Sequence, residues 1–147
     1  MLPAGINLDA PIVPNHSAGG IRLNDEACSI VRSAGLAYVE DPPHRIRKYP
    51  LGSVILWAKA GLVKQIGVVQ GYRGMINGRI ALGATIADVE RELGTVIEDD
   101  EDNLVVPSFP GWGFETEEWS GHELQANKHA RIVAIFVFRE DDSQSSV

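Results

Sequence analysis

The sequence predicts an α+β fold: two repeated helix-plus-strands units share one antiparallel sheet, and their helices pack on one face of it. Three observations predict this fold. Residues 19–57 match residues 78–116 at a constant offset of 59, with seven identities in thirty-nine positions. In each copy, a short apolar run at helical spacing precedes runs rich in β-branched and aromatic residues. Because a repeat of this length is typical of a supersecondary unit that packs against its copy, we expect one shared core.

The offset of 59 sets the expected domain boundaries. The aligned segments contain no gap: Gly19 corresponds to Gly78, and Ile55 near the end of the alignment corresponds to Phe114. The three expected parts of the chain are an extended N-terminal arm over 1–18 that covers a sheet edge, a single domain over 19–139 made of repeats 19–76 and 77–139, and a disordered acidic tail over 140–147.

The first repeat begins with a predicted short strand in which Ile21 and Leu23 alternate. Apolar residues recur at helical spacing at Ala27, Ile30, Val31 and Ala34, and they predict a helix for which Asn24-Asp25 supply N-cap chemistry. Gly35 provides the C-terminal stop. A helix of about ten residues is too short to be stable alone in water, so we expect it to pack on strands.

The second repeat predicts the same elements. Thr85 and Asp88 have the spacing of a capping box, and Gly94 ends the helix that follows. The other predicted elements are a short strand at 80–82, a helical stripe of Ile86, Val89 and Leu93, and hairpins formed by 53–57 with 62–69 and by 113–116 with 131–138. Residues 120–128 are an insertion in the second copy, which predicts a surface loop on the binding side.

Charge is unevenly distributed along this chain of net charge −7. Residues 22–85 carry nine basic and four acidic side chains, whereas residues 86–118 carry eleven acidic side chains and a single basic one, Arg91. Phosphate contacts need Lys and Arg, so the acidic stretch disfavours nucleic acid as a partner. It favours a basic protein, because opposite fields speed encounter and fix orientation. The alternative is that these side chains only keep the surface soluble.

The sequence predicts a cytoplasmic protein. No stretch approaches the roughly 20 apolar residues of a membrane span, and residues 1–5 lack the basic start and apolar run of a secretion signal. The single Cys28 has no second cysteine with which to form an internal disulfide.

The sequence contains no pattern that predicts catalysis. Cys28 lies next to the buried stripe of the first helix and is expected to be a buried thiol. His122 and His129 lack the spacing of a zinc motif, so we expect no metal site. Gly71-x-x-Gly74 lacks the Lys-Ser/Thr of a phosphate loop. We therefore expect a non-enzymatic protein without a cofactor.

Residues 107–119 mix aromatic and acidic side chains on a predicted turn and strand. Aromatic anchors beside acidic groups are typical of an interface with a basic partner. The alternative for both tryptophans is core or edge packing. The predicted partner-binding residues are Asp99, Asp100, Glu101, Asp102, Trp112, Glu115, Glu117, Glu118 and Trp119.

Two segments carry a resemblance to known families. Residues 78–94, with the pattern Gly-x-Ile-x-Leu-Gly-x-Thr-x-x-Asp-Val ending in Gly94, resemble the tandem helix-and-sheet unit of β-lactamase-inhibitory-protein-like folds, which small lipoprotein modules of outer-membrane assembly share. Residues 11–21 resemble small bacterial proteins encoded beside toxin genes of contact-dependent and type VI secretion systems. The resemblance spans most of residues 11–138.

By analogy, the resemblance implies a cytoplasmic immunity protein that binds and inhibits a cognate toxin domain. The absence of an export signal and of disulfides favours this branch over the lipoprotein and secreted-inhibitor branches. A basic toxin such as a nuclease suits an acidic inhibitor, and the sequence leaves the toxin's activity and the oligomeric state open. The alternative function is a small non-catalytic assembly or scaffold domain that uses an open sheet face to oligomerise or to join a housekeeping complex.

Overall fold

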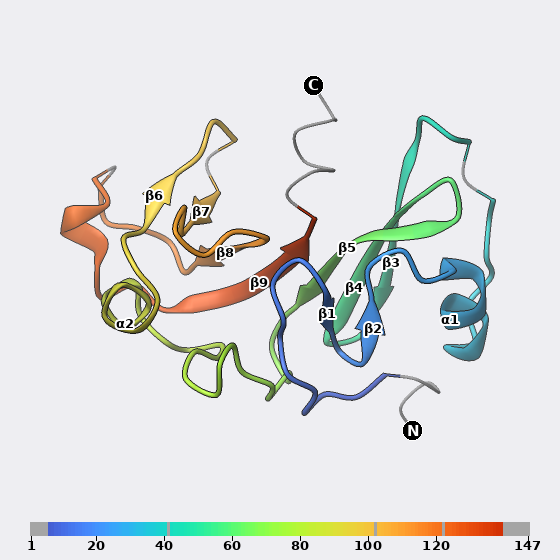
Figure 1. Cartoon of the computed structure of the whole chain (residues 1–147), viewed down its shortest axis with the longest axis horizontal. Coiled ribbons are helices and arrows are strands. Elements are labelled where there is room, and N and C mark those ends of the chain that lie inside the picture. The colour runs from blue at the N-terminus through green and yellow to red at the C-terminus, as the bar shows by residue number, and fades with distance from the viewer. Residues whose placement is uncertain (1–5, 41, 102, 122, 140–147) are drawn as a thin grey trace.

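The computed structural model describes residues 6–40, 42–101, 103–121 and 123–139. Its centre is a seven-stranded antiparallel sheet with the strand order β3-β4-β5-β9-β8-β7-β6 (Figure 1). The strands of this sheet are β3 (Ile46–Leu51), β4 (Val54–Lys59), β5 (Leu62–Val68), β6 (Ile97–Glu98), β7 (Leu104–Val105), β8 (Trp112–Thr116) and β9 (Ile132–Phe138). The predicted α+β class with an antiparallel sheet is confirmed.

The remaining elements are short. They are a two-stranded ribbon of β1 (Ser17–Ala18) and β2 (Ile21–Arg22), the helices α1 (Ala27–Ser33) and α2 (Ile86–Glu92), and the 3-10 helix η1 (Gln125–Asn127). Each α-helix has seven residues, fewer than the expected ten or so. Elements of this length depend on packing against the sheet.

One face of the sheet, here called the core face, carries the hydrophobic core. Leu56, Ile66 and Val137 pair in register across three neighbouring strands and are fully buried. The helices contribute Val31 and Val89 to the same cluster. The opposite face, here called the open face, carries the alternate side chains of the same strands, many of them half-buried.

The two helices differ at their N-termini. In α2 the predicted capping box is present: the Thr85 hydroxyl accepts the backbone N–H of Asp88 at 3.1 Å, and the Asp88 carboxylate accepts that of Thr85 at 3.0 Å. The prediction that Asn24-Asp25 cap α1 is wrong. The N-cap is Glu26, whose side chain makes no capping bond. The Asp25 carboxylate accepts the backbone N–H of Arg22 instead of capping the helix.

Replacing Thr85 with Ala is therefore expected to lower the free energy of unfolding by about 1 kcal/mol, the usual cost of losing an N-cap hydroxyl. Urea unfolding followed by circular dichroism measures the change. Glu26→Ala at the N-cap of α1 is the matched control and should change stability little, since its side chain caps nothing. Equal losses in the two variants would contradict a stabilising role for the capping box.

Some elements differ from the sequence prediction. Ile80 forms a single bridge with Ile76 in place of the expected strand at 80–82. Edge strand β3 was not predicted, because Arg47, Lys48 and Pro50 interrupt its apolar pattern. Strands β6 and β7 are two residues long, too short to show a period.

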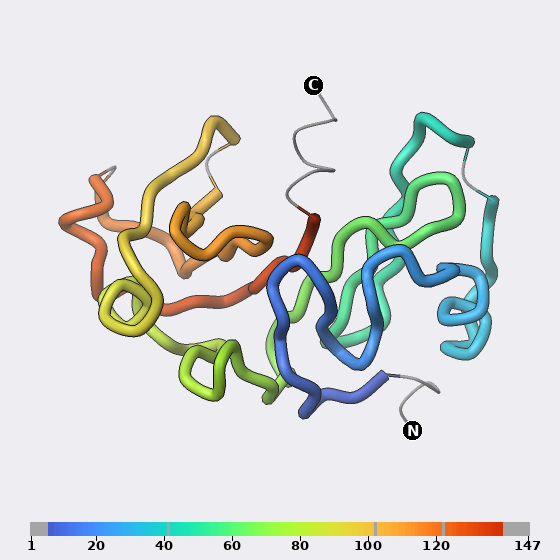
Figure 2. Tube along the Cα trace, in the orientation of Figure 1, coloured from blue at the N-terminus to red at the C-terminus, as the bar shows by residue number. Residues whose placement is uncertain are grey.

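The described part of the arm, residues 6–18, packs between the two halves of the chain (Figure 2). Ile12 is buried and donates its backbone N–H to the carbonyl of Met75 at 3.0 Å, and the Tyr72 hydroxyl bonds the carbonyl of Ala10. The expectation that the arm covers a sheet edge is corrected. Its described backbone bonds join it to the β1–β2 ribbon and the residues beside it, to the connection after β5 and to Gly111, and not to the edge strands β3 and β6. The predicted tail over 140–147 lies outside the described residues.

Candidate functional site

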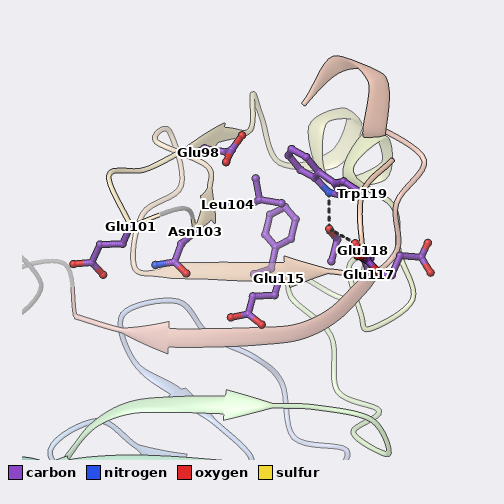
Figure 3. A pocket seen from close by; sticks show the side chains of 10 residues that line it. Glu98, Glu101, Asn103, Leu104, Glu115, Glu117, Glu118 and Trp119 are labelled. Carbon is purple, nitrogen blue, oxygen red and sulfur yellow. Dashed lines mark hydrogen bonds between the residues drawn. The ribbon is translucent and has the colours of Figure 1, made fainter. Parts of the chain in front are cut away.

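A hollow of about 430 Å³ lies beside strand β8 (Figure 3). Strand β7 pairs with β8 at a single position, Leu104 opposite Phe114. Among the described residues, β8 therefore has no strand neighbour on this side beyond that pair. The hollow is lined by Glu98, Glu101, Asn103, Leu104, Phe114, Glu115, Thr116, Glu117, Glu118 and Trp119.

The floor of the hollow is apolar and one wall is an indole. Phe114 and Leu104 are almost fully buried beneath it. The Trp119 ring is half-buried, and its Nε1–H donates to the Thr116 hydroxyl at 2.8 Å, while that hydroxyl donates to the carbonyl of Glu117 at 3.1 Å (Figure 3). These two bonds fix the position of the indole at the wall.

The rim of the hollow is acidic. Its lining contains five carboxylates and no basic side chain: Glu98, Glu101, Glu115, Glu117 and Glu118. None of the five forms an ion pair with a residue that the structure describes. Glu117 accepts the backbone N–H of Arg131 at 3.0 Å. The hollow is thus a region of negative potential next to an apolar floor.

The acidic side chains of α2 behave differently, because each of them is paired. Asp88 bonds Arg91 at 2.7 Å and Glu92 bonds Arg79 at 2.7 Å. Glu90 bonds Lys128 in the inserted loop.

The pKa values of these helical carboxyls follow from their partners. The hydrogen bond from the Lys128 ammonium lowers the pKa of Glu90, and that from the Arg79 guanidinium lowers the pKa of Glu92. For Asp88 the largest cause of the lowered pKa is the backbone N–H of Thr85. The acidic stretch at 86–118 is thus divided into a neutralised helix and an uncompensated hollow.

The structure brings together five of the nine predicted site residues. The lining includes Glu101, Glu115, Glu117, Glu118 and Trp119. Asp102 lies outside the described residues. Asp100 is exposed but does not line the hollow.

Asp99 and Trp112 have structural roles instead. The Asp99 carboxylate accepts the backbone N–H groups of Glu101 and Asn103, both at 2.9 Å, and so holds the turn between β6 and β7. Trp112 is 1% exposed, and its ring stacks on Phe114 with centroids 5.3 Å apart. The prediction that Trp112 anchors a partner is therefore wrong. Its ring packs in the hydrophobic core, which is the alternative that the sequence left open for it.

Sequence reasoning missed Glu98 and Asn103. Both lie on the β6–β7 hairpin, which brings them opposite β8. Glu98 belongs to the same acidic run as Asp99, so the charge pattern contained it, but no sequence period located the hairpin. The sequence does indicate where the Phe114 side chain points, because alternation along the predicted strand places Phe114 and Glu115 on opposite faces of the sheet.

Two kinds of feature are absent from the described residues. No group of three or more His, Cys, Asp and Glu side chains there is arranged to hold a metal ion. No helix in the described part of the chain has the length and apolar character needed to cross a membrane.

Comparison with known proteins gives little. No protein-family model matches the sequence, and no curated protein matches it. A solved structure with a partly similar chain path is that of the uncharacterized protein yfeY from Escherichia coli, with a TM-score of 0.42 and 14% identity. The match covers 59% of this chain and 62% of that one, less than two thirds of its length.

Proposed function

We propose that this chain is a bacterial immunity protein, which binds a basic toxin domain and blocks its activity without catalysing a reaction. The observation that carries this proposal is the acidic hollow, where five carboxylates without ion pairs to any described residue surround an apolar floor and a fixed indole. Such a site fits Arg or Lys side chains of a protein, because carboxylates pair with their charge and the Trp119 ring offers a face for cation–π contact. The Thr116 hydroxyl in the same lining accepts from Trp119 and donates to the backbone carbonyl of Glu117, not to a carboxylate that could activate it.

Electrostatics favours a macromolecular partner over a small cation. The rim carboxylates act together as a field that steers a basic surface toward the hollow. Trp119 and the floor residues then supply apolar contact at the centre, where binding energy concentrates. A nuclease is a suitable target class, since an enzyme that binds phosphates carries Lys and Arg around its active site.

We also propose that the two halves of the chain are structural repeats. The segments before the two helices make matching backbone bonds. Ala27 donates to the carbonyl of Gly61 at 2.9 Å, and Ile86 donates to that of Ala130 at 3.3 Å. The donors are separated by 59 positions and the acceptors by 69. Two further backbone bonds of the first half have counterparts at these separations. The bond from the N–H of Asn24 to the carbonyl of Val63 matches the bond from Gly83 to Ile132. The bond from the N–H of Val63 to the carbonyl of Asp25 matches the bond from Ile132 to Ala84.

The strands that follow support the same proposal through a shared irregularity. The register of β4 with β5 shifts between Trp57 and Ala58, and that of β8 with β9 shifts between Glu115 and Thr116. A β-bulge is a specific local feature, so its presence at matching sites supports descent of both halves from one unit. The strands β4 and β8 correspond at a separation of 58.

This correspondence modifies the gapless alignment of the sequence. The constant offset of 59 places Ile55 on Phe114. In the sheet, Leu56 lies opposite Ile66 and Phe114 lies opposite Ile135, and all four side chains are buried on the core face. On this proposal Leu56 is the counterpart of Phe114, and the second copy has one residue fewer than the first between helix and strand.

The proposed function is tested by reversing charge in the hollow. We expect the double variant Glu98→Lys, Glu118→Lys to bind the toxin domain encoded by the neighbouring gene on the order of 100-fold more weakly than the wild type. Calorimetry with the purified domain measures the affinity, and survival of cells that express the toxin measures protection.

The matched control is Glu26→Lys, Glu40→Lys, which makes the same change in net charge at exposed positions far from the hollow in sequence. Loss of affinity in the hollow variant together with near wild-type affinity in the control supports the proposal. Unchanged affinity in the hollow variant, or an equal loss in both, rules out the hollow as the binding site.

The second candidate function is an assembly domain that oligomerises through the sheet. One specific observation favours it: large apolar side chains on the open face are partly accessible, and Ile46 on the edge strand is 62% exposed.

A further inference from the structure

Two aromatic rings, those of Trp57 and Phe136, pack on the middle of the open face. Gly67 of β5 is paired with Ile55 on one side and Phe136 on the other. A Cβ at Gly67 would stand 2.9 Å from the Trp57 ring and 3.1 Å from the Phe136 ring, so both rings rest against its backbone. Their centroids are 5.7 Å apart, edge to face. The glycine makes the centre of this face flat, apolar and closely covered.

The charges around this flat centre have opposite signs on its two sides. On one side the Lys48 ammonium lies over the Trp57 ring, 5.7 Å from its centroid. On the other side Glu115 projects from β8 away from Phe114, toward the open face (Figure 3). Both Lys48 and Glu115 are exposed.

The strand register places Trp57 and Glu115 at equivalent positions in the two halves of the sheet. Trp57 and Glu115 both occupy the last position before the bulge of their strand. One row of paired residues crosses the sheet through Ile55, Gly67, Phe136 and Gly113. Trp57 and Glu115 each lie two residues from this row along their own strand, and they lie on opposite sides of it. The same structural position thus carries a lysine-capped indole in the first half and a carboxylate in the second.

We propose that the open face binds a second copy of this chain, in a symmetric face-to-face dimer in which Glu115 of each copy meets the Lys48–Trp57 pair of the other. The argument is charge complementarity between two sites placed symmetrically about the centre of one face. The two-fold axis of this dimer passes over the centre of the face and lies between the two sheets. It is perpendicular to the line that joins the two sites of one copy. The rotation therefore brings the acidic site of each copy opposite the basic site of the other.

The dimensions of the sheet allow this arrangement. Each site lies about 7 Å along the strands and about 7 Å across them from the centre, given rises of about 3.4 Å per residue and strand spacings of about 4.8 Å. The line joining the sites is then inclined by about 45° to the strands, and the two-fold axis makes the strands of the two copies cross at about 90°. Orthogonal crossing is one of the two preferred arrangements of packed sheets.

The test is a charge swap followed by sedimentation of the full chain. We expect the wild type to dimerise at micromolar concentration, and Lys48→Glu or Glu115→Lys alone to weaken dimerisation at least about tenfold. An equimolar mixture of the two variants restores both contacts. In the mixed dimer the introduced carboxylate of one variant faces the introduced ammonium of the other, and the native Lys48–Glu115 contact is kept at the second site. Restored dimers in the mixture therefore support the proposal.

The controls are Arg45→Glu and Glu40→Lys, which make the same charge changes at exposed positions outside the aromatic centre, and circular dichroism of every variant. A wild type that stays monomeric up to about 100 μM overturns the proposal and leaves the face to a different partner. Dimers that persist in both single variants, or a mixture that fails to dimerise, also overturn it. Glu115 lines the hollow as well as the open face, but the toxin-binding test substitutes Glu98 and Glu118 and measures toxin affinity, so failure of that proposal is distinguishable from failure of this one.

Discussion

Replacing Trp112 with Ala is expected to lower the free energy of unfolding by about 3–5 kcal/mol, the usual cost of removing a large aromatic side chain from a packed core. Trp112 is 1% exposed and stacks on Phe114, which is itself fully buried. The two rings lie on the core face of β8, next to the strand that joins the halves of the sheet. Urea unfolding monitored by far-UV circular dichroism measures the loss.

Two control variants separate packing from other effects. Trp112→Phe keeps an aromatic ring and removes an indole N–H that is buried without a hydrogen-bond partner among the described residues, so its cost should be much smaller. Trp119→Ala removes a half-buried ring and should also cost less stability. A loss at Trp119 equal to that at Trp112 would contradict the assignment of one tryptophan to the core and the other to the surface.

These two tryptophans show what the sequence reveals about the site and what it does not. The alternation on β8 placed Phe114 on one face and Glu115 on the other, and the structure agrees. The same alternation applied two residues earlier puts Trp112 beside Phe114 in the core. The sequence pattern predicts a strand that starts at Gly113, which leaves Trp112 in the preceding turn.

The hollow itself had no local signature. It exists because the β6–β7 hairpin turns Glu98 and Asn103 toward β8, and this hairpin is held by one carboxylate, Asp99, that accepts two backbone N–H groups. Its strands contribute two residues each, so no periodicity marks them. Such a site depends on tertiary pairing, whereas the capping box of α2 depends on residues three apart and was predicted correctly.

The open face was expected in outline, but its chemistry was not. A sheet with helices on one side leaves the other side accessible, which the sequence pattern predicted. The position of Trp57 over Gly67 follows from strand register, and the proposed equivalence of Trp57 with Glu115 is based on the two bulges. The gapless offset of 59 instead places Trp57 on Thr116, one residue from the position that the bulges indicate.

Gly74→Ala is expected to destabilise the fold by more than about 2 kcal/mol, because the added methyl group would collide with the backbone of Ala10 and with the Tyr72 ring. Its Cβ would stand 1.9 Å from the carbonyl oxygen of Ala10 and 2.6 Å from the Tyr72 ring. The same glycine donates its N–H to the carbonyl of Leu8 at 3.1 Å. The clash therefore acts on the contact between the arm and the connection that links the two halves.

Urea unfolding measures the total loss, and hydrogen exchange at Ile12 shows whether the arm is released first. Gly83→Ala is the matched control: its φ is +94° and no atom lies within 4 Å of the added Cβ, so it carries backbone strain without a collision. An arm that only decorates the surface would give equal, small losses in the two variants and unchanged exchange at Ile12. A larger loss at Gly74 with faster exchange at Ile12 would instead show that the arm holds the two halves of the sheet together, since it bonds Met75 on one side and Gly111 on the other.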